Sequence, residues 1–182
     1  MKLTRRQSIV AGLATVTAAM GAGRTRAAET SADPTLEFAF EVVASLEAPL
    51  QLGNTGMGVR RIIGVTGGTV TGPKLNGIVL PGGADWQIVR ADGVTEISAR
   101  YTLQADDGAL IYVENPGIRE ATPEVIARIN AGEIVDPSEY YFRTTPRLET
   151  SSEKYAWMNR RLFVCKGVRL PDGVEIRYFV VT

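Results

Sequence analysis

Between residues 36 and 181, apolar and polar side chains alternate in short runs that glycine, proline, asparagine and aspartate interrupt. A period of two is typical of β-strands with one buried face. The runs recur at the spacing of about 8–12 residues found in all-β sandwiches and barrels. The predicted strands are residues 36–46, 59–66, 69–79 with a bend at 72–73, 85–90, 94–104, 109–114, 140–145, 155–166 and 174–181.

One segment instead carries the signature of a short helix. Thr122 is a suitable N-cap, Pro123 fits the first helical position, and Glu124 complements the positive end of the helix dipole. Apolar residues then recur along one side until Gly132, which ends the helix.

These elements predict an all-β domain. We expect a closed antiparallel β-barrel of about eight to ten strands with one short helix over one end or side, and a β-sandwich is the alternative. Residues 36–182 form this single domain, and residues 28–35 form a polar linker in front of it.

Residues 1–27 are predicted to be a signal peptide. Arg5 and Arg6 precede a weakly apolar run at 9–22, and Ala27 ends a small-residue cleavage site. The arginine pair indicates the twin-arginine export route, although Ser8 stands where the usual motif favours phenylalanine. The run of about 14 residues is shorter than the roughly 20 that span a bilayer, so no membrane anchor is expected after cleavage. The mature protein is predicted to be periplasmic or secreted.

Charge and composition exclude several classes of function. Residues 1–27 contain five of the 20 basic side chains and none of the 20 acidic ones, which leaves 15 basic and 20 acidic residues in the mature chain. This balance argues against nucleic acid as a partner. The chain has no histidine, which removes Ser-His-Asp and Cys-His mechanisms and the usual zinc sites. No metal site is predicted, because an all-oxygen site would need a spaced acidic loop that is not visible.

Cysteine and glycine add two further expectations. Cys165 is the single cysteine, and its place in an apolar alternation predicts a buried structural thiol. The pairs Gly67-Gly68 and Gly82-Gly83 follow strands, but no helix opens after them, so a dinucleotide site is not expected. No cofactor is predicted.

Two polar, aromatic stretches, residues 72–86 and 144–159, contain the candidate catalytic residues. Asp85 lies beside Trp86, and burial near an aromatic wall would raise the pKa of a carboxyl toward that of a useful acid or base. The alternative is that Asp85 caps a turn while Trp86 fills the core. Glu149, in a loop rich in Thr and Ser, is the second candidate.

Aromatic, arginine and amide side chains near these stretches are the candidate ligand contacts. Tryptophans would stack on a ligand, arginines would bind an anionic or carbonyl oxygen, and tyrosines would donate a hydrogen bond. A solvated surface position is the alternative for the arginines, and simple packing is the alternative for the tyrosine. If these residues form one site, they should converge on one cavity. The candidates are Trp86, Arg100, Tyr141, Arg143, Trp157 and Asn159.

Motifs spread along residues 36–181 resemble the domain-of-unknown-function 3237 family, also called uncharacterised protein family 0311. The combination is specific, although each motif alone is weak. The resemblance implies a compact β-barrel and no established activity. The motifs are GVRR at 58–61, GPKLNG at 72–77, LPGGADW at 80–86, Tyr101 through Asp107-Gly108, and YFR at 141–143 through Pro146, Glu149-Thr150 and YAWMN at 155–159.

Three functions remain open on these grounds. The first is an exported barrel that binds a small molecule, partly aromatic or bearing a carbonyl. The second is a cofactor-free isomerase, cyclase or lyase in which Asp85 or Glu149 is the base and Arg143 or Tyr141 stabilises an oxyanion. The third is an interaction module without a ligand pocket. The sequence leaves the oligomeric state and the identity of any ligand open.

Overall fold

A computed structural model of the chain describes residues 33–182. The predicted signal peptide, residues 1–27, lies outside the described residues, and so does most of the predicted linker at 28–35. Within residues 33–182, no helix is long and apolar enough to cross a membrane.

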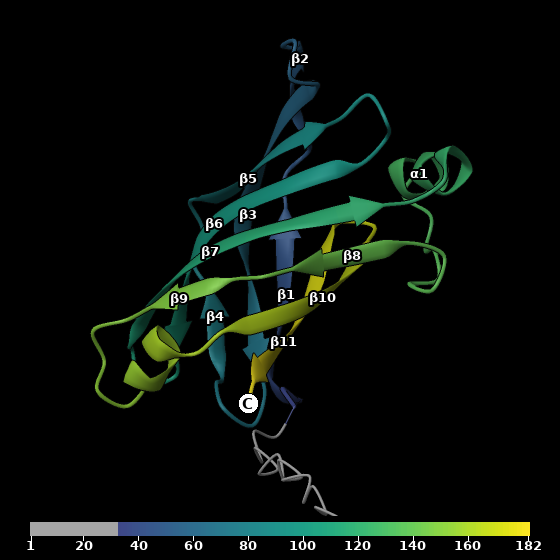
Figure 1. Cartoon of the computed structure of the whole chain (residues 1–182). Helices are drawn as coiled ribbons and strands as arrows, with labels where there is room; N and C mark the ends of the chain where they lie inside the picture. Colours follow the sequence, from purple (N-terminus) through teal and green to yellow (C-terminus); the bar gives the residue numbers. More distant parts are fainter. Residues whose placement is uncertain (1–32) are drawn as a thin grey trace, which may run out of the picture. The chain divides into compact units, whose positions relative to one another are not determined.

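Eight antiparallel strands form a closed ring (Figure 1). Around the ring, β3 pairs with β1, β1 with β11, then β10, β8, β7, β6 and β5, and β5 pairs with β3 again. The predicted closed barrel is therefore confirmed, and the sandwich is not formed. The strands of the ring are β1 (Leu36–Leu46), β3 (Val59–Thr71), β5 (Gly83–Val89), β6 (Thr95–Ala105), β7 (Leu110–Glu120), β8 (Tyr141–Thr144), β10 (Phe163–Leu170) and β11 (Gly173–Val181).

Three short strands complete the sheet, and two of them explain the unusual stretches of the sequence. β4 (Gly77–Val79) and β5 follow one another in the gap between β3 and β6. β8 and β9 (Arg147–Glu149) follow one another along β7 in the same way. The polar, aromatic stretches at 72–86 and 144–159 thus contribute to walls of the barrel that are built from interrupted strands. The third short strand, β2 (Leu50–Asn54), extends β3 where the sequence predicted only a loop.

The glycine pair in β3 bulges the strand without ending it. Gly68 has φ +149°, and a Cβ atom there would lie 2.1 Å from the carbonyl oxygen of Val43 in the neighbouring strand. The register between β1 and β3 shifts at the same point. β3 therefore runs through a position that only glycine can occupy at this spacing, and it contacts both β5 and β4.

The helix prediction is confirmed, whereas the strand predicted at 155–166 is partly wrong. α1 (Pro123–Asn130) begins after Thr122, whose side chain accepts a hydrogen bond from the Val125 N–H. Residues 156–160 form a short 3₁₀ helix, η1 (Ala156–Arg160), and β10 begins only at Phe163. The break changes which side chains share a face, because alternation holds only within a continuous strand.

The interior of the barrel is apolar at one end and polar at the other. Leu103, Ile111 and Tyr178 are fully buried in the apolar core, and so is Cys165, as predicted. Toward the end near α1, the inward positions become polar and include buried Gln87 and Arg119. The inward-facing polar side chains that could bind or react with a ligand therefore lie mainly at this end.

Candidate functional site

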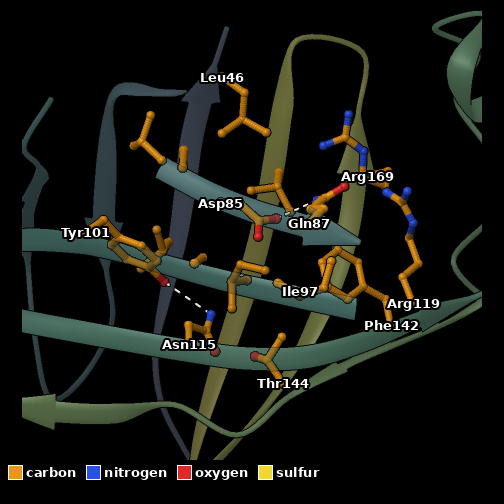
Figure 2. A pocket seen from close by; sticks show the side chains of 16 residues that line it. Leu46, Asp85, Gln87, Ile97, Tyr101, Asn115, Arg119, Phe142, Thr144 and Arg169 are labelled. Carbon is orange, nitrogen blue, oxygen red and sulfur yellow. Dashed lines mark hydrogen bonds between the residues drawn. The ribbon is translucent and has the colours of Figure 1, made fainter. Parts of the chain in front are cut away.

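A cavity of about 50 Å³ lies inside the barrel (Figure 2). It adjoins a wider mouth of about 280 Å³, because Leu46, Arg119 and Arg169 line both spaces. Residues 129–130 of α1 and the turn between β10 and β11 border the mouth. The cavity walls are mostly apolar, with the polar side chains Asp85, Gln87, Tyr101, Asn115, Arg119, Thr144 and Arg169 among them.

Alternation along β5 places the only carboxylate among the described cavity-lining residues. Asp85 and Gln87 point into the barrel, and Trp86 between them points out. The Ser98 backbone N–H donates to Asp85 Oδ1 at 2.9 Å, and Gln87 Nε2 donates to Asp85 Oδ2. Arg61 Nε donates to Gln87 Oε1 at 2.7 Å, which directs the amide nitrogen of Gln87 toward Asp85. The carboxyl is thus held by two donors in a fixed orientation.

The surroundings of Asp85 shift its proton affinity in opposite directions. Burial raises its pKa above the ordinary 3.8, and this effect exceeds the lowering by Gln87, the Ser98 N–H, Arg119 and Arg61. Its remaining exposure is intermediate, and it lines the cavity. Asp85 is therefore a carboxyl that keeps its proton to higher pH than usual and that a small molecule in the cavity could reach.

Three arginines surround the entrance to the cavity. Arg61, Arg119 and Arg169 line the mouth from β3, β7 and β10. Burial, followed by repulsion from the other two arginines, lowers the pKa of Arg119 to about 10, so this side chain remains charged at neutral pH. Burial also lowers the pKa of Arg61 and of Arg169. The three guanidinium groups therefore concentrate positive charge at the entrance, although residues 33–182 have 15 basic and 19 acidic side chains.

A tyrosine pair lies deeper in the barrel. The hydroxyls of Tyr101 and Tyr178 share a hydrogen bond, and Asn115 Nδ2 donates to Tyr101 at 3.4 Å. Burial raises the pKa of both hydroxyls, so the pair is neutral at physiological pH. Buried Asn115 Oδ1 has no hydrogen-bond partner among the described residues. Thr144 Oγ1, which also lines the cavity, is buried without a partner in residues 33–182 as well. The cavity thus offers two unpartnered oxygens close to a neutral hydrogen-bonded pair.

The predicted convergence of all candidate residues on one cavity is wrong. Trp86 lies on the outside of the barrel, where the guanidinium of Arg100 lies 5.9 Å from its ring. Neighbouring residues of one strand face opposite sides, so Asp85 and Trp86 cannot share a site. Trp86 does not fill the core, and Arg100 is half exposed and paired with Glu114.

The candidates from the second stretch also lie outside the cavity. Glu149 pairs with Arg147 at 2.9 Å, and both line an outer groove with Asn159. Asn159 exchanges hydrogen bonds of 2.9 and 2.8 Å with the backbone of Thr150, so it holds the loop.

The remaining candidates, Tyr141, Arg143 and Trp157, do not line the cavity either. Arg143 lies 5.3 Å from the ring of exposed Tyr141, on the outward face of β8. Trp157, in η1, packs against Phe163 with their ring centroids 5.8 Å apart. Asp85 is therefore the only predicted site residue that lines the cavity.

The sequence did contain a signal for the residues that were missed. On β7, Asn115 and Arg119 continue the inward series that begins with buried Ile111 and Val113. On β10, Arg169 continues the series of Phe163 and Cys165. A polar residue two positions beyond an apolar inward series indicates a polar end of the barrel interior. Alternation extended to the end of each strand therefore predicts that Asn115, Arg119 and Arg169 face inward.

Comparison with known proteins agrees with the fold and gives no established activity. The family model described as "Protein of unknown function (DUF3237)" matches residues 34–181. A UPF0311 protein of Clostridium acetobutylicum is 46% identical over 147 residues, which cover 80% of this chain and 93% of that protein. The crystal structure of a conserved protein of unknown function from Rhodopseudomonas palustris superposes with a TM-score of 0.78 at 43% identity, covering 81% of this chain and 99% of that one.

A more distant relative has a named activity. A hydroalkoxylation enzyme of Penicillium herquei is 29% identical over 126 residues, 69% of each chain. An enzyme structure from the same fungus superposes with a TM-score of 0.60 at 24% identity, covering 82% of this chain and 95% of that one, and this likeness supports the fold alone. From the match over nearly the whole described domain and the bacterial relatives, we conclude that this chain belongs to the DUF3237 (UPF0311) family of β-barrel proteins.

Proposed function

We propose that the barrel binds a small organic molecule at its polar end and that Asp85 transfers a proton to or from it. The protein would then be a cofactor-independent acid–base enzyme of the isomerase, cyclase or lyase type. The observation that carries the proposal is the position of Asp85, the one carboxylate among the described residues that line the cavity.

The dimensions of the site favour a ligand that enters only in part. Sites for small molecules usually measure about 300–1,000 Å³. The cavity of about 50 Å³ has room for one small group, and the mouth of about 280 Å³ has room for the remainder. The reacting group would therefore lie inside, next to Asp85, while the rest of the ligand stays between α1 and the β10–β11 turn.

The hydrogen bonds to Asp85 suit both halves of a proton transfer. In its neutral form, the carboxyl donates a proton to a carbon or oxygen of the ligand. The resulting carboxylate is stabilised by the Ser98 N–H and by Gln87. It then takes a proton from another ligand atom, such as a hydroxyl, so Asp85 returns to its starting state and no proton is gained or lost.

The fungal relative supports the choice of reaction class. It is named a hydroalkoxylation enzyme, and hydroalkoxylation adds the O–H of an alcohol across a carbon–carbon double bond. Such an addition requires a proton to reach one carbon while oxygen bonds to the other. An acid–base group in a partly apolar cavity can supply that proton.

We also propose that the mature domain works in the periplasm or outside the cell. The supporting observation is the order of basic, apolar and small residues in positions 1–27. Ligand binding without turnover is the second candidate function, and the unpartnered Asn115 Oδ1 favours it because a ligand donor could fill that acceptor. The arginine-lined opening argues against an interaction module without a pocket.

The test starts from the ligand that copurifies with the protein, identified by native mass spectrometry. Turnover and affinity for that compound are then measured for the wild type, Asp85→Asn and Glu149→Gln. Glu149 is a matched control because it is a half-exposed carboxylate on the outer groove. We expect Asp85→Asn to lower turnover by about 100-fold or more with affinity retained, and Glu149→Gln to change neither. Full turnover in Asp85→Asn would refute the catalytic role.

A further inference from the structure

The three arginines at the mouth combine a shared position at one opening with the lack of an ion pair within residues 33–182. Arg90, Arg100, Arg128, Arg147 and Arg177 each pair with a carboxylate of the protein. No such pair within 4.0 Å joins Arg61, Arg119 or Arg169 to a carboxylate of residues 33–182. Four other arginines have no such pair either, but none of them lines the mouth or the cavity: Arg60, Arg143, Arg160 and Arg161. Arg61, Arg119 and Arg169 are thus the unpaired arginines that meet at one opening.

The hydrogen bonds of the mouth arginines are also incomplete. Arg61 Nε is used by Gln87. Arg119 is only 6% exposed, and its side chain makes none of the hydrogen bonds found within residues 33–182. Arg169 Nε is buried without a partner. Burial of an unpaired charge is unfavourable, so we expect a cluster of this kind to bind an anion.

Nearby acids do not supply that anion. Glu47 and Asp172 line the mouth but form no ion pair with the three arginines. Asp85 faces the cavity, where its hydrogen bonds come from Ser98 and Gln87. The positive charge of the entrance is therefore left for a molecule from outside.

We propose that the ligand is a small organic carboxylate whose anionic group binds to Arg119 and Arg169 at the mouth while a small part of its apolar body enters the cavity toward Asp85. Guanidinium groups bind carboxylates through paired charge-assisted hydrogen bonds, which suits these two side chains. The inward walls formed by Val42, Ile97, Ala99 and Ile176 suit an apolar body. This inference names the substrate class of the proposed function and rests on that function for the role of Asp85.

A bound carboxylate would also assist the proposed chemistry. Its negative charge would neutralise the arginines, which otherwise favour the ionised form of Asp85. Asp85 would then hold its proton more firmly when the ligand is present than when it is absent. Ligand binding and protonation of Asp85 would thus favour each other.

Benzoate is a suitable probe, with benzamide as its uncharged isostere. Binding is measured by titration calorimetry for the wild type, Arg119→Met, Arg169→Met and Arg160→Met. Arg160→Met is the matched control because it removes the same charge from an exposed position in η1, away from the mouth. We expect benzoate to bind the wild type about tenfold or more tightly than benzamide, each mouth variant to lose about tenfold or more in benzoate affinity, and the control to keep it.

A second measurement needs no substitution and covers the case in which a variant does not fold. In ¹H–¹⁵N spectra of the wild type, benzoate should shift the Nε–Hε signals of Arg119 and Arg169 and leave that of Arg160 in place. Unmoved Arg119 and Arg169 signals, or equal affinity for benzoate and benzamide, would overturn the anion inference.

The two proposals fail in different ways. Equal binding of benzoate and benzamide in the cavity would refute the inference that the ligand is a carboxylate. It would not affect the proposed role of Asp85. Arginine-dependent benzoate binding together with full turnover by Asp85→Asn would refute the proposed catalytic role of Asp85. The inference of a carboxylate-binding site would still hold. Asp85→Asn should still bind benzoate, because Asp85 is not a ligand of the anion.

Discussion

Filling the interior cavity should stabilise the barrel and abolish ligand binding. Ala99 lies on the inward face of β6, opposite Asp85 in the sheet, and lines the cavity. Ala99→Val adds two methyl groups directed into that space, and a β-branched side chain suits a strand.

The magnitude follows from the size of the cavity. An unfilled volume of about 50 Å³ costs about 1.2 kcal/mol at about 24 cal/mol per Å³. Burial of two methyl groups contributes up to about 1.6 kcal/mol. We therefore expect Ala99→Val to raise the free energy of unfolding by about 1 kcal/mol, or the melting temperature by about 2–4 °C for a domain of this size.

The assay is urea unfolding followed by circular dichroism, with Ala105→Val as the matched control. Ala105 is on the same inward face of the same strand, but it belongs to the packed core and does not line the cavity. Overpacking there should cost about 1–3 kcal/mol. Equal losses of stability in both variants would contradict the presence of free space beside Ala99. Benzoate binding by Ala99→Val that is as tight as binding by the wild type would show that the cavity is not the ligand site.

Three further outcomes are expected. Because burial raises the pKa of Asp85 above 3.8, the folded state keeps a proton that the unfolded chain has lost, so the contribution of Asp85 to stability falls as pH rises from about 4 through the raised pKa. Asp85→Asn should therefore gain stability relative to the wild type toward neutral pH, by about 1.4 kcal/mol per unit of pKa elevation. A difference in unfolding free energy between the variant and the wild type that does not change with pH, measured by urea unfolding, would contradict this. Cys165 is fully buried and burial raises its pKa, so a thiol reagent should label it only after denaturation, and rapid labelling of the native protein would be inconsistent with the fold. Gly117→Ala should weaken or unfold the barrel, because its Cβ would lie 2.4 Å from the Arg143 carbonyl oxygen, and an unchanged melting temperature would contradict that contact.

Much of the fold could be predicted because the relevant signals are local. Alternation along residues 94–104 indicated a strand where β6 lies, and Thr122-Pro123 indicated the start of α1. The interruption of two barrel walls could not be predicted, because β4 and β9 are recognised only by the strands they pair with. The same holds for β2, whose sequence is rich in turn residues and becomes a strand by pairing with β3.

The candidate site was harder to predict, because convergence is a property of the closed ring. Asp85 lines the cavity, but its supposed partner Trp86 lies on the other face of the same strand. Arg119 and Arg169 come from strands that are not neighbours in sequence, and the pairing of both β7 and β10 with β8 brings them to one opening. The sequence prediction placed the site in stretches rich in aromatic and polar residues. The polar side chains that line the cavity instead lie toward one end of the inward strand faces.

The position of a bound ligand tests the central claim most directly. We expect a crystal structure of the protein soaked with benzoate to show the carboxylate against Arg119 and Arg169, with the ring pointing into the barrel toward Asp85. Benzoate bound only on the outside, against Trp86 and Arg100 or in the groove of Glu149 and Asn159, would contradict an interior site.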